Sequence, residues 1–214
     1  ASVLAEARAL SEDPSPAVRR EVALSLRGLP FEDSRDIFQK LAAAYDGVDR
    51  WYLEALGIAA WGIEDRLYSA LLPTLGDPDP LRWDARFSAI AWRLHTVTAV
   101  DGFRERAKSG ALTAADRRQA LVAIAFVDDP QAAAVMAELT VSELPDVAAQ
   151  AAWWMTYRKA NDWRVYPVEG WVPAAPDTKP AAINESVTLR AVVLDADAPI
   201  DRRMREPDEL RHPQ

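Results

Sequence analysis

The sequence predicts an all-α protein, specifically an α-solenoid of about five antiparallel helix pairs. Glycine is scarce, with eight in 214 residues, and most prolines fall between apolar stretches. Acidic or proline turns also recur, each followed by an arginine and an alanine- and leucine-rich stretch. The recurring positions are Arg19, Arg50, Arg86 and Arg118, with Gln150 as a fifth copy, and subtracting their numbers gives spacings of 31, 36, 32 and 32 residues. A recurrence of this length is typical of stacked helical units.

The first units are predicted from capping signals and apolar spacing. Residues 2–11 are expected to be the second half of an earlier helix. Ser15 is expected to cap the next helix and Pro16 to take its first position, where its missing N–H costs nothing. The apolar face of this helix recurs at spacings of three and four: Val18, Val22, Leu26 and Leu29.

The remaining pairs follow the same pattern of apolar stripes and turns. In the second pair, Ile37, Leu41 and Ala44 form one stripe, and Gly57 indicates close packing against a neighbouring helix. Gly110 is expected to end one helix of the fourth pair, and Thr113 is expected to cap the other. The expected helix pairs, from the second to the fifth, are 32–45 with 50–60, 64–75 with 83–94, 98–109 with 113–127, and 130–141 with 144–160.

The last part of the chain differs in character. Residues 163–180 hold four prolines and no helical period, which predicts an irregular extended segment. Residues 185–194 are expected to form a short C-terminal helix, followed from Pro199 by the start of a truncated sixth repeat. The predicted domains are therefore 1–160, the helical repeats, and 161–214.

Composition excludes several classes of function. The net charge of −8 argues against a nucleic-acid partner, because such binding depends on clustered Lys and Arg. No apolar run reaches the ~20 residues that a membrane-spanning helix needs, so no membrane insertion is expected. The absence of cysteine excludes disulfides, thiolate metal sites and covalent haem attachment within this chain.

The turn-and-helix pattern resembles HEAT repeats. The resemblance covers about residues 1–160. The residues that carry it lie at the start of the second helix of each pair: Asp13 with Val18 and Arg19, Asp49 with Arg50, Asp84 with Arg86, and Asp116 with Arg117. This resemblance implies a curved stack of helix pairs that supplies a binding surface.

A narrower resemblance lies in three segments: 15–24, 45–58 and 151–154. They are similar to the HEAT region of large secreted haem-binding dehydrogenase-like proteins of planctomycetes, in which a β-propeller precedes the repeats and a cytochrome c domain follows them. The resemblance implies a scaffold that joins redox domains, in the periplasm or outside the cell; the residues themselves leave a cytoplasmic location open. The haem attachment motif is missing here, so no catalytic residue of that family is transferred and no cofactor is expected in this chain.

Two sets of residues are candidates for function. The first is a structural ladder in which Asp and Arg side chains hydrogen-bond between neighbouring turns and fix the stacking: Asp13, Arg19, Arg50, Arg86 and Arg117. Binding of an anionic ligand is the alternative role for these side chains. The second set is four of the eight tryptophans, expected on the concave face as partner contacts: Trp51, Trp83, Trp153 and Trp154. Packing between helices is the alternative for them.

Catalytic signals are weak. His95 and His212 are the only histidines, no H-E-x-x-H or G-x-S-x-G pattern accompanies them, and no metal site is expected. Asp128 and Asp129 are adjacent and are expected to end a helix rather than do acid–base work. The sequence therefore favours a noncatalytic scaffold that binds a protein partner or neighbouring domains of the same polypeptide.

Two alternatives remain open at this point. A HEAT-like DNA glycosylase for alkylated bases fits the size and the tryptophan content, although its groove needs positive charge to hold phosphates. A salt-sensitive complex with DNA would support that enzyme. A chromophore lyase or chaperone is the other alternative, which absorbance after incubation with pigments would reveal.

Overall fold

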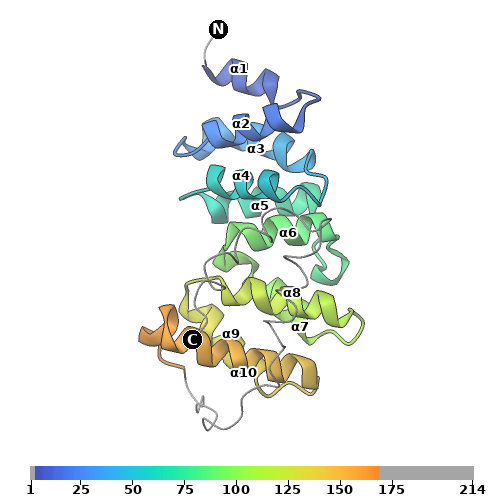
Figure 1. Ribbon diagram of the computed structural model, residues 1–214, viewed down its shortest axis with the longest axis vertical. Coiled ribbons are helices and arrows are strands. Elements are labelled where there is room, and N and C mark those ends of the chain that lie inside the picture. The colour runs from blue at the N-terminus through green and yellow to red at the C-terminus, as the bar shows by residue number, and fades with distance from the viewer. Residues whose placement is uncertain (1–2, 169–214) are drawn as a thin grey trace, which may run out of the picture. The chain divides into compact units, whose positions relative to one another are not determined.

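The computed structural model describes residues 3–168, and every regular element in that range is helical (Figure 1). These residues belong to the first of two compact units, Ala1–Pro173, and the second unit is Ala174–Gln214. The all-α prediction is confirmed for the described range. The expected C-terminal helix, the sixth repeat and most of the proline-rich segment lie outside the described residues.

Ten α-helices and three short 3-10 helices make up the described range, close to the predicted bounds. The α-helices are α1 (Val3–Leu10), α2 (Pro16–Ser25), α3 (Phe31–Ala43), α4 (Arg50–Ala59), α5 (Glu64–Leu75), α6 (Ala85–Leu94), α7 (Val100–Lys108), α8 (Ala114–Ala125), α9 (Pro130–Leu139) and α10 (Pro145–Ala160). The 3-10 helices are η1 (Pro80–Arg82), η2 (Val97–Ala99) and η3 (Asp162–Val165).

The helices of the first unit pack in two rows. Each even-numbered helix contacts the next even-numbered one, from α2 through α4, α6 and α8 to α10. On the other side α1 contacts α3, α3 contacts α5, and α7 contacts α9. Consecutive helices such as α7 and α8 also pack against each other, so each pair joins the two rows (Figure 1).

Local capping explains where several helices start. Thr113 caps α8 with a reciprocal capping box to Asp116, as predicted. Asp49 accepts a hydrogen bond from the Tyr52 N–H at the start of α4. Ser15 stands at the N-cap position of α2 but makes no side-chain cap bond, and its own N–H donates to the Asp13 carboxylate at 2.8 Å.

The core between the rows combines aliphatic and aromatic side chains. Ile37 and Leu41 are fully buried, as their stripe predicts. Around Trp83 the rings pack edge to face, with centroids 5.2 Å from Phe87 and 5.4 Å from Phe103. Burial in this cluster raises the pKa of Tyr68 to about 12. This aromatic cluster therefore joins α5, α6 and α7.

Gly57 allows close approach between α4 and α6, as the sequence predicts. A Cβ atom at this position would lie 2.2 Å from the Arg93 guanidinium. That guanidinium pairs with Glu54 at 2.7 Å, and Arg50 pairs with the same carboxylate at 2.9 Å. Burial alone raises the pKa of Glu54, but the hydrogen bonds and charges of Arg93 and Arg50 lower it overall. The Glu54 carboxylate of α4 therefore links this helix to α6.

The helical unit extends beyond residue 160, where the sequence predicted a domain boundary and an extended segment. Residues 162–165 form η3, and Trp163 is fully buried. Its indole N–H donates to the Val127 carbonyl at 3.0 Å, and the Arg158 guanidinium lies 5.3 Å from its ring centroid. Trp163, in the short helix after α10, thus belongs to the same core as the preceding helices, because a large apolar ring gains more free energy from burial than from exposure.

Candidate interaction surface

A stripe of large apolar side chains follows the row of even-numbered helices near their C-terminal ends. Leu24 of α2, Ile58 of α4, Trp92 of α6 and Phe126 after α8 follow one another at equal intervals in the sequence. Leu24 and Ile58 are each 37% exposed, and Phe126 is 44% exposed. Each of these four residues lies within two positions of the C-terminal end of its helix.

A second set of residues lies beside the first, one helical turn further along. Arg27, Trp61 and His95 recur at the same interval as the first set. Trp61 is 62% exposed, and the Arg27 guanidinium lies 4.0 Å from its ring centroid. The His95 ring stacks on Phe126 with centroids 5.6 Å apart. The two sets together form what we call the aromatic stripe, which also includes the α10 residues Trp153, Trp154 and Tyr157.

On α10 the stripe becomes a continuous group of rings. Phe126 meets Trp154 with centroids 6.0 Å apart, and Trp154 meets Trp153 at 4.7 Å. Trp153 is stacked on Tyr157 at 5.5 Å with nearly parallel planes. Trp153 is 43% exposed and Tyr157 51% exposed. This end of the stripe therefore presents two stacked, half-exposed rings held in place by a third.

Three ring nitrogens of the stripe have no hydrogen-bond partner within residues 3–168. They are Trp92 Nε1, His95 Nε2 and Trp154 Nε1, and each is shielded from solvent. His95 ends α6 with a left-handed backbone, φ 50°. Burial lowers the pKa of His95 and the charge of Arg93 acts in the same direction, against the smaller opposite effects of Glu54 and Glu64, so the neutral imidazole is favoured. The stripe thus contains indole donors without acceptors, which costs free energy in a folded protein.

A cleft of about 500 Å³ adjoins the stripe between α6 and α8. It is lined by Trp92, Ala114, Ala115, Arg118, Gln119 and Val122. Val122 lies one turn before Phe126 on the same face of α8, which makes the cleft continuous with the stripe. Arg118 is exposed and has neither a hydrogen bond nor an ion pair in the described part of the chain. The cleft therefore offers an available positive charge beside an aromatic ring.

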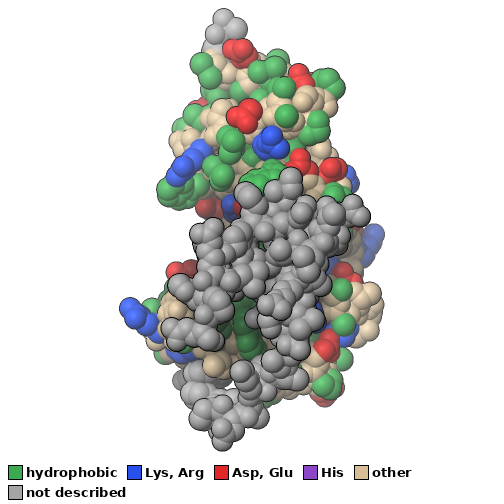
Figure 2. Space-filling view, in the orientation of Figure 1, with side chains coloured by type: hydrophobic (Ala, Val, Ile, Leu, Met, Phe, Trp, Pro, Cys, Tyr) green, Lys and Arg blue, Asp and Glu red, His purple; other side chains and the backbone are tan. Residues whose placement is uncertain are grey.

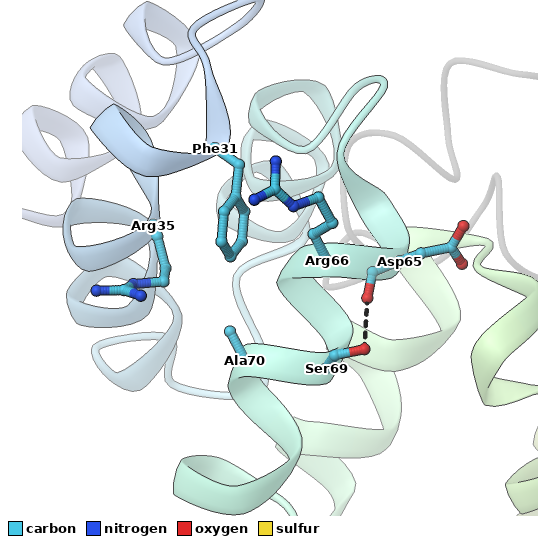
Figure 3. Close-up of a pocket in the computed structure, with 6 residues that line it drawn as sticks. All are labelled: Phe31, Arg35, Asp65, Arg66, Ser69 and Ala70. Atoms are coloured by element: carbon cyan, nitrogen blue, oxygen red, sulfur yellow. Dashed lines mark hydrogen bonds between the residues drawn. The ribbon is translucent and has the colours of Figure 1, made fainter.

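A second hollow of about 410 Å³ lies between α3 and α5, lined by Phe31, Arg35, Asp65, Arg66, Ser69 and Ala70 (Figure 3). The Arg66 guanidinium lies 4.0 Å from the Phe31 ring and pairs with Glu32, and Arg35 pairs with Asp36. Both cations that line the hollow are therefore already paired with carboxylates.

The Asp65 carboxylate points away from this hollow in Figure 3. It accepts hydrogen bonds from the hydroxyls of Thr96 and Thr98. The bond from Thr96 is the main reason that the pKa of Asp65 is lowered. Asp65 thus links α5 to the segment after α6, and the hollow is a weaker candidate site than the cleft beside the stripe.

The tryptophans expected to be contact residues have different positions. Trp153 and Trp154 belong to the stripe. Trp51 is 62% exposed in the first turn of α4, whereas the stripe follows the C-terminal ends of the even-numbered helices. Trp83 does not fit the expectation, because it is buried and its indole N–H donates to the Asp77 carbonyl at 2.8 Å. It precedes α6 and is directed into the core, so it belongs to no exposed surface.

The expected ladder of Asp and Arg side chains is only partly regular. Arg117 pairs with Asp146 of the next unit at 2.7 Å, which is the expected kind of bond. Arg19 reaches the next unit differently, since its Nε donates to the Tyr52 hydroxyl at 3.4 Å. Its Nη1 donates to the backbone carbonyl of Asp13 at 2.6 Å rather than to the carboxylate.

The other two arginines of the ladder make different contacts. Arg50 pairs with Glu54 one turn along its own helix. Arg86 lies 3.4 Å from Asp84 in its own turn and packs over Gly47, where a Cβ atom would be 2.8 Å from its Cγ. The prediction of a uniform ladder was therefore wrong in detail, because Arg50 and Arg86 stand at the first and second positions of their helices, whereas Arg19 and Arg117 stand at the fourth.

Replacement of Arg19 by alanine is expected to lower the melting temperature. The change removes hydrogen bonds to two backbone carbonyls and to the Tyr52 hydroxyl, for a loss of about 1 kcal/mol. Thermal unfolding followed by circular dichroism measures the shift, with Arg20→Ala on the same helix as the matched control. Unchanged stability combined with lost partner binding would instead assign Arg19 to a binding site.

The aromatic stripe was not predicted from the sequence, because the predicted contact surface was based on tryptophans at the second helices and the predicted ladder on arginines at the helix starts. The signal is present in the sequence as the constant interval from Leu24 to Ile58, from Ile58 to Trp92 and from Trp92 to Phe126. A search for apolar residues at one fixed period near the helix ends would have found it. Trp92 and Phe126 would then have joined the candidate contact residues.

The described residues contain no group of three or more His, Cys, Asp or Glu side chains placed to hold a metal ion together. Between residues 3 and 168, no helix combines the length and hydropathy needed to cross a bilayer. Comparison of the chain with protein families, curated proteins and solved structures gave no match.

Proposed function

We propose that this chain is a noncatalytic α-solenoid of the HEAT type, a scaffold that uses the aromatic stripe to bind a protein partner or a neighbouring domain. The observation that carries the proposal is the recurrence of large apolar side chains, exposed at Leu24, Ile58 and Phe126 and half-buried at Trp92, at a constant sequence interval along one row of helices. Repeated helix pairs that each present an equivalent position build a long binding surface, as solenoids do.

The chemistry of the stripe supports a protein partner. Contiguous exposed apolar surface marks interaction sites, and tryptophan and tyrosine are favoured there because they give large contact areas at low entropic cost. Acidic and basic side chains are mixed on the described part of the surface in Figure 2. With a net charge of −8, this mixture favours a protein ligand over a phosphate backbone.

The resemblance to secreted haem-binding dehydrogenase-like proteins gives the proposal its biological setting. In that setting the chain joins redox domains of one long polypeptide in the periplasm or outside the cell, and holds no cofactor itself. The stripe would then contact a flanking domain. Sequencing of the complete open reading frame tests this setting directly. A stop codon soon after Gln214 would contradict the multidomain setting and leave a separate binding protein.

A binding measurement tests the scaffold function. The segments that flank residues 1–214 are produced separately and titrated against this chain by calorimetry. Trp153→Ala is expected to weaken binding about tenfold, because the change removes an exposed ring that stacks on Tyr157. Val141→Ala is the matched control, since Val141 is an apolar residue 82% exposed and outside the stripe. Equal effects of the two variants would contradict the proposed function, and failure of both flanking segments to bind would exclude a neighbouring domain as the ligand of the stripe.

A further inference from the structure

The aromatic stripe contains one histidine, His95, which stands at the C-terminal end of α6. Its backbone is left-handed, and its N–H donates to the Trp92 carbonyl at 3.1 Å. Its ring is stacked on Phe126 with planes 28° apart, and it meets the Trp92 ring edge to face with centroids 6.1 Å apart. A left-handed backbone is uncommon for a residue with a side chain and persists where the surroundings fix it. The imidazole therefore has a set position between two rings of the stripe.

Protonation changes the hydrogen bonds that this imidazole needs. Nε2 of His95 is shielded from solvent and has no partner within residues 3–168. A neutral imidazole carries its proton on one nitrogen only, so Nε2 can remain without a proton while Nδ1 carries it. In the cation both nitrogens are donors, which makes Nε2 a shielded donor without an acceptor. Uptake of a proton therefore costs free energy as long as the ring stays in the stack.

The charges around His95 do not remove this cost. Four charged side chains act on the imidazole, and none of the four belongs to α8: Arg93 of α6, Glu54 of α4, Glu64 of α5 and Arg158 of α10. Glu54 is already paired with Arg93 at 2.7 Å and with Arg50 at 2.9 Å. Burial, Arg93 and Arg158 lower the pKa of His95, whereas Glu54 and Glu64 raise it by less. The neutral form is therefore the one that suits the stack.

Phe126 is the ring that responds when His95 changes position. Its centroid lies 5.6 Å from that of His95, 6.4 Å from that of Trp92 and 6.0 Å from that of Trp154. Phe126 is also 44% exposed, which makes it one of the stripe side chains available to a partner. If the imidazole leaves the stack to reach water, Phe126 loses one of these three ring contacts. Its position on the binding surface is then less well fixed.

We propose that the stack of His95 on Phe126 is a pH-sensitive contact, which is closed when His95 is neutral and opens when the ring takes up a proton, so that a partner binds the stripe less tightly. The regulation of binding rests on the proposed scaffold function, whereas the opening of the stack does not. Histidine has an ordinary pKa of about 6.5, so the transition falls between neutral and acidic media. Such a scaffold holds its partner at neutral pH and releases it as the medium becomes acidic.

Protonation of His95 is measured directly by NMR of the imidazole C–H signals during a pH titration of the full chain. The chain has two histidines, so His95→Asn assigns the signals, and asparagine tolerates a left-handed backbone. His212→Asn, at a position outside the described residues, gives the same assignment without changing the stack. His95 is expected to titrate below the ordinary histidine range, with a parallel change in tryptophan emission because Trp92 adjoins the ring. Titration at or above that range would overturn the inference.

Thermal stability gives a second measure with a definite sign. Because the pKa of His95 is lowered, its contribution is complete above the unfolded pKa and is lost as the pH falls through the folded pKa. Between about pH 7.5 and about pH 5.5, the melting temperature of the unmodified chain should fall about 2–4 °C further than that of His95→Asn. Carboxylates with a lowered pKa, such as those of Glu54 and Asp65, are present in both chains and cancel. His212→Asn should behave like the unmodified chain, and equal falls for all three chains would overturn the inference.

Binding at the same two pH values shows whether the contact regulates the stripe. The affinity of the unmodified chain for a flanking segment should fall about threefold at the lower pH, whereas that of His95→Asn should change little. An equal change for both chains would overturn the regulatory role. If Trp153→Ala weakens binding while His95 titrates in the ordinary range, the scaffold function stands and this inference fails. If His95 titrates as expected while Trp153→Ala and Val141→Ala bind equally, the pH-sensitive stack stands and the scaffold function fails.

Discussion

Replacement of Trp163 by alanine is expected to lower the free energy of unfolding by about 3–5 kcal/mol. The ring is fully buried and its N–H donates to the Val127 carbonyl, so the change removes both packing and a hydrogen bond across the unit. The effect is large for a residue that lies beyond the last long helix. Urea unfolding measured by tryptophan fluorescence or circular dichroism gives the free energy.

Two further variants separate the causes. Trp163→Phe keeps most of the apolar volume but loses the bond to Val127, so it should cost less than the alanine variant. Val165→Ala removes a side chain that is 70% exposed in the same short helix, and it should change stability by less than about 0.5 kcal/mol. Similar stability of Trp163→Ala and Val165→Ala would mean that residues 161–168 are not part of the core.

Replacement of Gly102 by alanine is expected to destabilise the protein although it improves helix propensity. In an isolated helix this change gains about 1 kcal/mol. In α7, however, the new Cβ atom would lie 2.4 Å from Cη2 of Trp83. That ring cannot retreat easily, because Phe87 and Phe103 flank it and its N–H is bonded to Asp77. Overpacking of this kind costs about 1–3 kcal/mol.

Gly110→Ala is the matched control for this prediction. Apart from Gly110 itself and its two chain neighbours, no atom lies within 4 Å of a Cβ placed at Gly110, so the melting temperature of this variant should change little. Thermal unfolding of the two variants beside the unmodified chain gives the comparison. A higher melting temperature for Gly102→Ala would show that helix propensity outweighs the contact with Trp83.

Much of the helical arrangement could be predicted because its signals are local. Thr113 and Asp116 form a capping box within four residues, and Ile37 and Leu41 show the face of their helix by spacing alone. Trp83 and Trp163 could not be placed in this way. Their burial depends on residues far along the chain, such as Phe103 and Val127, which no local pattern identifies.

The candidate site was predicted less completely than the helices. Adjacent positions on a helix point in directions about 100° apart, so Trp153 and Trp154 were not both expected in one core, and at least one of them was expected on a contact surface. Both rings lie in the stripe, and their role as partner contacts stays a prediction. Trp92 and Phe126 were missed, since each is unremarkable in its own helix. Their relation appears only when equivalent positions of successive units are compared.

The packing of each helix against its neighbour in the same row has a consequence for how the chain folds. The side-chain bonds between neighbouring helix pairs join residues that are fewer than 40 positions apart in the sequence. Glu54 and Arg93 are 39 positions apart, and Arg104 and Glu138 are 34 positions apart. Neither bond requires the two ends of the chain to meet. During synthesis each helix pair can therefore form its side-chain bonds soon after the following helix pair leaves the ribosome. Protection of the backbone amides from hydrogen exchange should accordingly rise from α1 towards the central helices, and should not be the same for all the helices from α1 to α10.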